Sequence, residues 1–106
     1  MLEEVGFKLL SPSTATVAEL LYPYAELYGL ELVKLSGGRL KRGSIYVILA
    51  RMADKGYVES RTVPAPRGTQ GPARRKFKLT SGGGAMFEAH SAARLSFLAR
   101  LGRATA

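Results

Sequence analysis

Lysine and arginine are the side chains in this sequence whose number and spacing suggest a chemical role. Eleven of the sixteen fall between positions 39 and 78, against only Asp54 and Glu59, so this stretch carries +9 and the rest of the chain −1. A local excess of cations marks a surface for an anionic partner. The closely spaced phosphates of a nucleic acid fit best. An anionic membrane is the competing partner, but the apolar side of the central helix suits a protein core better than lipid.

The sequence contains few of the residues that usually carry out catalysis. The chain has no cysteine and one histidine, His90, which falls in a helical pattern near the C-terminus. A zinc site, a Cys-His pair or a Ser-His-Asp arrangement therefore cannot be assembled. The glycines at 37, 38, 43 and 82–84 lack the spacing of a phosphate-binding loop. We predict no catalytic residue, no metal and no cofactor, and we expect His90 to be an exposed or interfacial residue of a helix.

Length and composition favour one folded chain. The 106 residues are 46% apolar and 23% charged, which is typical of a globular protein and unlike a disordered basic tail. No apolar run is long enough to cross a membrane, and the start of the sequence does not resemble a signal peptide. We expect a cytoplasmic protein.

A helix over 41–55 is the element expected to position the basic residues. Ile45, Ile48, Leu49 and Met52 recur at helical spacing and form one apolar stripe. Gly56 then ends the helix. The solvent side would carry two rows, Arg42, Tyr46 and Ala50 in one and Ser44, Arg51 and Lys55 in the other.

Shorter helices should precede it. A weak pattern indicates a helix over 2–10, and Ser11 with the following proline predicts the start of a helix over 12–21. A second segment over 27–34 and a glycine-containing turn over 36–40 complete a helix-turn-helix outline. Tyr28 is expected in the core of this unit.

Two strands should follow the helix, over 57–63 and 75–79, with Phe77 and Leu79 inward and Lys76 and Lys78 outward. The loop over 64–73 contains several prolines and glycines and reads as a wing tip that becomes ordered on a partner. Thr80 or Ser81 should cap a C-terminal helix. Its apolar side chains have nothing to cover within the chain, so pairing with a second copy would bury them.

These features together predict an α+β fold, a winged helix-turn-helix with a two-stranded wing and a C-terminal dimerisation helix. Residues 1–80 would form a DNA-binding domain and residues 81–106 the dimerisation element.

The chain resembles the PadR family of winged-helix transcriptional regulators. Four pieces carry the resemblance in the family's order and spacing, across about residues 27 to 80. They are Tyr28-Gly29, Gly43-Ser44-Ile45-Tyr46 with Leu49, Arg51 and Met52, then Gly56-Tyr57-Val58, and Gly71-Pro72-Ala73-Arg74-Arg75-Lys76-Phe77-Lys78-Leu79-Thr80.

The resemblance implies a homodimer whose recognition helices enter adjacent major grooves, with wings on the backbone or minor groove. It also implies a repressor role that a small molecule sometimes relieves, although no effector can be named. By position, Tyr46 would contact the backbone, and Lys41, Arg42 and Ser44 would lie at the groove.

Three departures stand out. Lys41-Arg42 replaces a frequent Ser-Pro, Gly82-Gly83-Gly84 should weaken the start of the last helix, and the chain stops earlier than larger relatives.

The residues predicted to contact DNA are Lys41, Arg42, Ser44, Tyr46, Arg51, Arg67, Arg74, Arg75, Lys76 and Lys78. Those predicted to form the dimer interface are Phe87, Leu95, Leu98 and Leu101.

Alternatives remain open at several of these positions. Tyr46 could pack on the second helix, Arg51 could pair with Asp54 or Glu59, and residues 74–76 could be a charged strand edge. For the whole chain, the prediction is a DNA-binding repressor on a two-fold operator. The alternatives are a winged-helix module that binds an acidic protein and a nonspecific binder of DNA or RNA.

Overall fold

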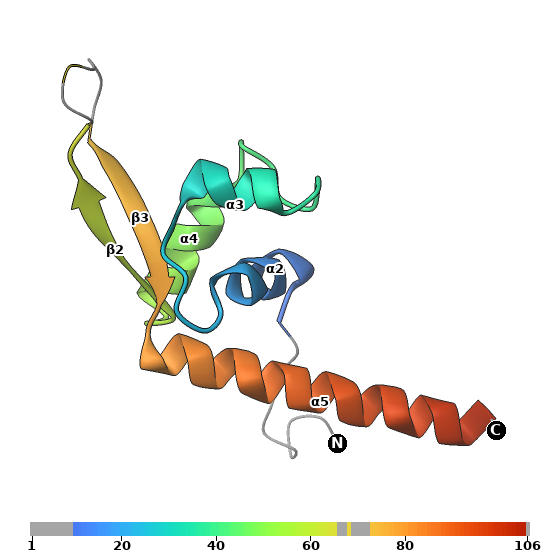
Figure 1. Cartoon of the computed structure of the whole chain (residues 1–106). Helices are drawn as coiled ribbons and strands as arrows, with labels where there is room; N and C mark the ends of the chain where they lie inside the picture. Colours follow the sequence, from blue (N-terminus) through green and yellow to red (C-terminus); the bar gives the residue numbers. More distant parts are fainter. Residues whose placement is uncertain (1–9, 66–67, 69–72, 106) are drawn as a thin grey trace.

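A computed structural model describes residues 10–65, 68 and 73–105 of the chain, which form an α+β fold (Figure 1). The elements in chain order are α2 (Pro12–Leu21), β1 (Leu27–Tyr28), α3 (Gly29–Leu35), α4 (Ile45–Asp54), β2 (Val58–Val63), β3 (Arg74–Leu79) and α5 (Ser81–Thr105). The helices α2, α3 and α4 lie on one side of the sheet, and α5 runs past them at the base (Figure 1). The helix predicted over 2–10 and most of the predicted wing tip fall outside the described residues.

Helix α2 has the predicted bounds, and local chemistry explains both ends. The Ser11 hydroxyl accepts a hydrogen bond from the Thr14 amide at 3.4 Å, and Pro12 occupies the first turn, where its missing N–H is not needed. The helix ends at Leu21 because Tyr22, which precedes Pro23, takes an extended conformation.

The second helix begins later than predicted. Leu27 and Tyr28, predicted as helical, form a short strand that pairs with Phe77 and Lys76 of β3. The Tyr28 amide donates to the Glu31 carboxylate at 2.8 Å, and this contact starts α3 at Gly29. The two-stranded wing is therefore part of a three-stranded sheet of order β1-β3-β2. A strand of two residues is too short for alternation to reveal it.

The turn before α4 is built on a buried serine. Ser36 accepts the Leu40 amide at 2.9 Å and donates to the Val33 carbonyl at 2.7 Å. Gly37 and Gly38 have the positive φ that the predicted turn requires. Leu40 is buried and fixes this turn to the core.

Helix α4 is shorter than the predicted 41–55. Residues 41–44 form a turn in which the amides of Ser44 and Ile45 both donate to the Lys41 carbonyl, at 3.2 and 3.0 Å. Lys41 and Arg42 therefore precede the helix instead of lying on it. The C-terminal end agrees with prediction, since Lys55 is the C-cap and Gly56 follows with φ +78°.

The core lies between the three small helices and the inner face of the sheet. The predicted stripe of α4 faces it, with Ile45, Leu49 and Met52 buried and Ile48 half-buried. The sheet contributes Val58, Phe77 and Leu79, which confirms the inward direction of the last two. The remaining core residues are Val17, Ala18, Leu21, Leu32 and Leu40.

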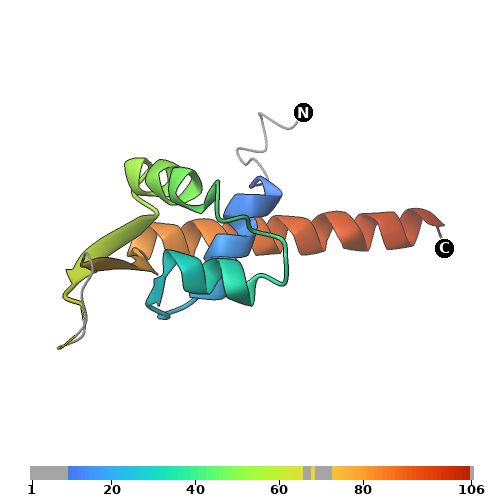
Figure 2. The ribbon, with the colours of Figure 1, turned by 90° about the horizontal axis from the view of Figure 1, so that it is seen from above.

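Helix α5 starts at Ser81 despite its three glycines. The Thr80 hydroxyl accepts the Gly83 amide at 3.0 Å, as a predicted cap would. Gly83 is buried, and a Cβ there would lie 2.9 Å from the Tyr57 carbonyl carbon. The absence of a side chain therefore lets α5 approach the start of the wing. Helix α5 projects well past α2, α3 and α4 (Figure 2). The longest dimension of the molecule is 61 Å.

Within the described part of the chain, no helix combines the length and the apolar character needed to cross a bilayer.

Candidate nucleic-acid interface

The solvent side of α4 and its preceding turn bring together five of the predicted contact residues. Lys41 and Arg42 are exposed in the turn, Ser44 is the half-buried N-cap, and Tyr46 and Arg51 project from the helix. Within the described residues none of the three cations pairs with a carboxylate. The surface is thus positively charged and available to an anion.

Tyr46 is both packed and exposed. An added Cβ at Gly29 would lie 2.7 Å from Cε1 of Tyr46, so the ring lies against the first residue of α3. The residue nevertheless keeps 53% of its surface exposed. Tyr46 therefore packs on the second helix, as the alternative for this residue has it, and still leaves about half of its surface exposed to solvent.

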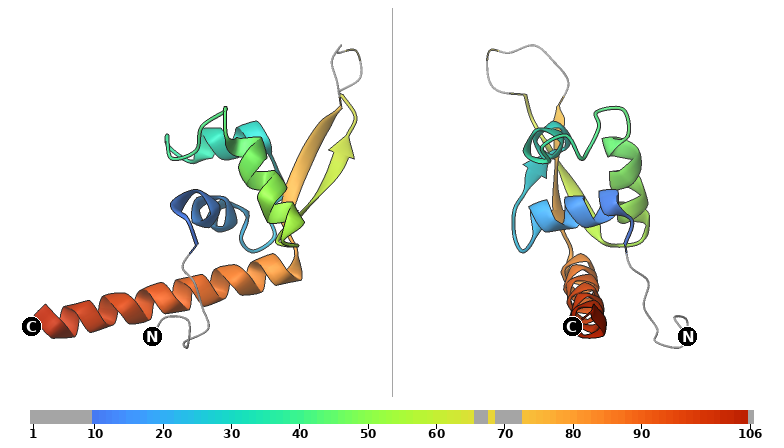
Figure 3. Two further views of the ribbon diagram at one scale, coloured as in Figure 1. Left: turned by 180° about the vertical axis from the view of Figure 1, so that it is seen from behind. Right: turned by 90° about the vertical axis from the view of Figure 1, so that its right-hand side faces the viewer.

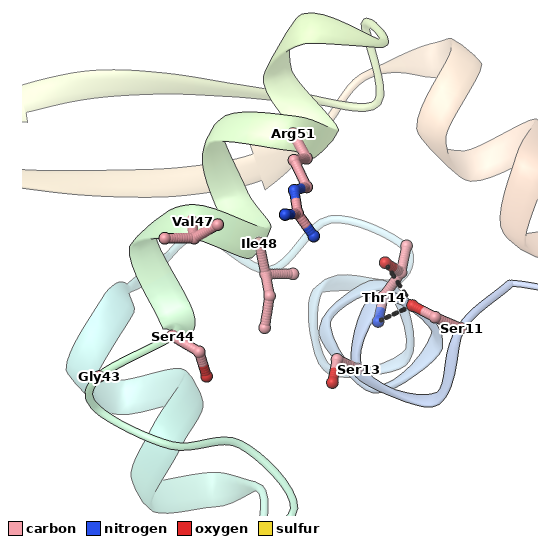
Figure 4. Close-up of a pocket in the computed structure, with 8 residues that line it drawn as sticks. All are labelled: Ser11, Ser13, Thr14, Gly43, Ser44, Val47, Ile48 and Arg51. Carbon is pink, nitrogen blue, oxygen red and sulfur yellow. Dashed lines mark hydrogen bonds between the residues drawn. The ribbon is translucent and has the colours of Figure 1, made fainter.

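Arg51 lines a hollow between α4 and the start of α2. This hollow has a volume of about 380 Å³, and Arg51 reaches across it toward Thr14 (Figure 4). Neither alternative partner of Arg51 is used, because Glu59 pairs with Lys78 at 3.4 Å and Asp54 makes no ion pair in the described chain. The lining is hydroxyl-rich and consists of Ser11, Ser13, Thr14, Gly43, Ser44, Val47, Ile48 and Arg51.

Val47 was missed by the sequence analysis. It lies between Ser44 and Arg51 on the outward side of α4 and is 51% exposed. Its position outside the apolar stripe is visible in the sequence, but an apolar side chain carries no charge that would mark it as part of a basic surface. An exposed aliphatic group in such a place can contact a thymine methyl.

The basic residues of the wing divide between two faces of the sheet. Cross-strand pairing sets Ser60 opposite Phe77 and Thr62 opposite Arg75, so Arg75 shares the face of the core residues. Its guanidinium donates to the Ser60 hydroxyl at 3.2 Å. By alternation the other face holds Arg74, Lys76 and Lys78. Arg67 falls outside the described residues.

Tyr28 lies on the outer face of the sheet, where two basic side chains contact its ring. The Arg74 guanidinium lies 5.8 Å and the Lys76 ammonium 5.0 Å from the centre of its ring, which is cation–π geometry. Tyr28 is half-buried, so the prediction that it belongs to the core is wrong. Pairing with Lys76 places it on the outer face instead.

Ion pairs offset part of the positive charge on this outer face. Arg61 donates to both carboxylate oxygens of Glu26, at 2.8 and 2.7 Å, and Lys78 pairs with Glu59. The Arg61 hydrogen bonds hold the pKa of Glu26 below its usual value. Arg74 and Lys76 are therefore the cations of this face with no carboxylate partner among the described residues.

The residues 19–89 match the transcriptional regulator PadR-like family. The chain belongs to this family. Among curated proteins no sequence matches it.

Solved structures of PadR proteins share the fold. A PadR-like transcription factor from Bacteroides fragilis matches with a TM-score of 0.73 and 22% identity, covering 85% of this chain and 86% of that one. A PadR family regulator from Clostridium difficile gives 0.68 and 23%, covering 86% and 94%. Bacillus subtilis PadR in complex with operator DNA gives 0.63 and 21%, covering 72% and 44%. The family and these neighbours are transcription regulators.

The predicted dimer residues of this PadR-family chain differ in their surroundings. Phe87 packs within its own chain, with its ring centre 5.1 Å from that of Tyr22. Leu95 is 68% exposed and Leu98 49%, and Phe97 and Leu101 are also exposed. Of the predicted dimer residues, Leu95, Leu98 and Leu101 are therefore the exposed ones, and they lie in the outer half of α5.

Proposed function

We propose that this PadR-family regulator binds double-stranded DNA as a homodimer and acts as a repressor, with α4 in the major groove and the wing on the phosphate backbone. The observation that carries the proposal is the solvent side of α4. There Lys41, Arg42 and Arg51 surround the half-exposed Tyr46 and Val47, and none of the cations has a carboxylate partner in the described residues.

Each group has a distinct role in this proposal. The turn cations Lys41 and Arg42 approach the groove, where an arginine can bind a guanine edge through two hydrogen bonds. Ser44 and Arg51 contact phosphates beside the hollow, and the exposed edge of Tyr46 lies on the backbone. The wing cations Arg67, Arg74, Arg75, Lys76 and Lys78 add phosphate contacts, which raise affinity for any sequence.

Two further points support the proposal. The Bacillus subtilis relative was solved with operator DNA, and it shares this fold. The exposed apolar side of α5 suits a two-fold pairing between copies, which would set two recognition helices on half-sites about 34 Å apart. In this arrangement residues 1–80 bind DNA and residues 81–106 join the dimer.

The test is selection of duplexes from a genome-derived pool at two salt concentrations. We expect one palindromic sequence to be enriched. If six to eight phosphates are neutralised, log affinity should fall against log salt with a slope of about −5 to −7. Arg51→Ala should reduce the slope by about 1. Tyr46→Ala should lose the enrichment.

Arg100→Ala is the matched control, since it removes one exposed positive charge from α5 on the side away from Leu95 and Leu98, and it should leave the selected sequence unchanged. Uniform binding to all duplexes would replace the proposal with a nonspecific nucleic-acid binder. A slope near zero, or no binding, would point to an acidic protein partner.

A further inference from the structure

Helix α5 is attached to the winged helix at two places. The first lies at its start, where the Thr80 amide donates to the Tyr57 carbonyl at 3.0 Å and Gly83 lies against the same backbone. The Thr80 hydroxyl also donates to the Gly56 carbonyl. All of these contacts fall within about one helical turn, so they act as a pivot and do not by themselves fix the direction of α5.

The second attachment lies one to two turns later and faces the end of α2. The Tyr22 hydroxyl donates to the Glu88 carboxylate at 2.5 Å, and the Tyr22 ring packs on Phe87. The Glu88 hydrogen bond raises the pKa of Tyr22. The Leu10 amide donates to Nδ1 of His90 at 3.1 Å, so the segment before α2 is held to the same part of α5.

Beyond these contacts α5 extends past the other described helices and strands (Figures 2 and 3). From Arg94 to Gly102 its residues are exposed. The apolar residues proposed for dimerisation lie on this outer part. Any change in the direction of α5 is therefore passed on to the position of a partner subunit.

We propose that the contact between Tyr22 and the Phe87-Glu88 pair is the joint that fixes the angle of α5 and thereby sets the half-site spacing that the dimer accepts. The inference rests on the proposed function for its consequence on DNA, whereas the joint itself is a property of the single chain. Tyr22 and Glu88 are positioning residues in this proposal, and they touch no DNA.

Because α5 is long, a small change in its angle to the winged helix moves its far end by a large distance. From Gly83 to Leu101 the helix runs about 27 Å at 1.5 Å per residue. A tilt of about 10° at the pivot would move the far end by about 5 Å, more than the 3.4 Å rise of one base pair. One added base pair also rotates a half-site by about 34–36°, since a turn contains 10–10.5 base pairs. A dimer that distinguishes spacings therefore needs a rigid joint.

The first arm of the test measures the joint without DNA. The chain lacks cysteine, so Lys34→Cys on α3 and Ser96→Cys on α5 place two nitroxide labels at exposed positions without competing sites. The labelled chain is mixed with an excess of unlabelled chain, so that each distance is measured within one molecule. We expect a narrow distance distribution in the parent and one about twice as wide in Tyr22→Ala, because the ring and hydroxyl contacts of Tyr22 with Phe87 and Glu88 are lost.

Tyr22→Phe keeps the ring and removes the hydroxyl, so it should show a smaller increase and guards against a folding defect in Tyr22→Ala. Tyr24→Ala is the matched control, since Tyr24 lies two residues away and is 90% exposed. If the distance distribution between the labels is unchanged in both Tyr22 variants, the proposal that Tyr22 fixes the angle of α5 is wrong.

The second arm measures spacing. The selected operator is rebuilt with one or two base pairs added or removed between its half-sites. We expect the parent to prefer one spacing by about tenfold or more and Tyr22→Ala to lower that preference to about threefold or less, with binding to a single half-site unchanged. An unaltered preference in Tyr22→Ala would overturn the role in spacing. If the parent selects no operator, the proposed function fails, and the label distances still decide whether the joint exists.

Discussion

Gly29 and Tyr46 are linked by direct contact, although they lie on different helices. The ring of Tyr46 occupies the space that a side chain at position 29 would need. The atoms in that contact are the far end of a half-exposed side chain, so they can move away easily. Gly29 has no positive φ, and therefore its backbone accepts alanine. A side chain at position 29 should therefore change the direction of the Tyr46 ring more than it changes the stability of the fold.

We predict that Gly29→Ala changes the free energy of unfolding by less than about 1 kcal/mol. The higher helix propensity of alanine should offset the packing that the Tyr46 ring loses when it is displaced. DNA affinity should fall about as much as in Tyr46→Ala, because the ring turns away from its position. Urea unfolding and binding to the selected duplex measure the two effects. Full affinity in Gly29→Ala would show that the ring's position has no part in binding.

Individual residues differ in how far the sequence predicts their position. The cations of the α4 surface were found because charge is visible in the sequence. Val47 was not found, since exposure of an apolar residue depends on what packs beside it. The position of Tyr28 depends on its pairing with Lys76, a contact between residues far apart in the sequence. Such contacts are a property of the fold, and local spacing does not contain them.

At the scale of elements, the start of α5 depends on one of its three glycines. Gly83 faces the Tyr57 backbone, which cannot move aside as a side chain can, whereas an added Cβ at Gly84 meets nothing within 4 Å. The sequence predicted a weak start from helix propensity alone. Propensity was outweighed here by a close approach between two elements.

We therefore predict opposite effects from two adjacent substitutions. Gly83→Ala should destabilise the protein by about 1–3 kcal/mol or more because α5 must shift from the wing. Gly84→Ala, the matched control, should stabilise it by about 0.5–1 kcal/mol through helix propensity. Chemical unfolding of both variants measures this. Equal effects would mean that α5 does not approach Tyr57 closely.

The ion pair across the sheet gives a prediction with a defined pH dependence. The Arg61 hydrogen bonds lower the pKa of Glu26 below its ordinary value of 4.5, so the folded state favours the ionised carboxylate. This contribution to stability is present above pH 4.5 and is lost as pH falls through the lowered pKa. Glu26→Gln should therefore be less stable than the parent at neutral pH and should approach it in acid.

Thermal unfolding of both proteins from about pH 7 down to about pH 3 measures this difference. High salt should reduce it, because both side chains are at the surface. A difference in stability that does not change with pH would assign the effect to packing and not to charge.

The elements themselves were predictable to different degrees. The four residues of the α4 stripe defined that helix and its end, because Gly56 supplies a C-cap that sequence reveals. Its start was misplaced by four residues, since the turn over 41–44 is held by the Lys41 carbonyl and by the buried Leu40. The strand β1 was missed because two residues acquire strand geometry only through a partner.

In the whole molecule, the apolar surface proposed for dimerisation lies on the outer half of α5, away from the basic surface of α4 and the wing. The exposed cations of α4 and the wing lie on the winged helix, and the exposed Leu95, Leu98 and Leu101 lie on the outer half of α5. Figure 3 shows that this half of α5 extends past the other elements. A substitution on one surface should therefore leave the other intact. Binding to DNA and association between copies can then be tested separately.

We predict that Leu98→Asp converts the dimer to a monomer without unfolding the chain, because Leu98 is exposed within its own chain and an aspartate would be desolvated against a partner. Ser96→Asp is the matched control, since helical spacing sets it opposite the apolar side of α5 and it adds the same charge. Sedimentation equilibrium measures the association, and the thermal midpoint should lose its concentration dependence only in Leu98→Asp.

The monomer should still bind a single half-site through α4, with the same salt dependence per subunit, and should lose the additional affinity for the two-fold operator that linkage of two sites provides. If Leu98→Asp remains dimeric with unchanged operator affinity, the copies associate through a surface other than the outer half of α5. The half-site spacing would then be independent of the direction of this helix.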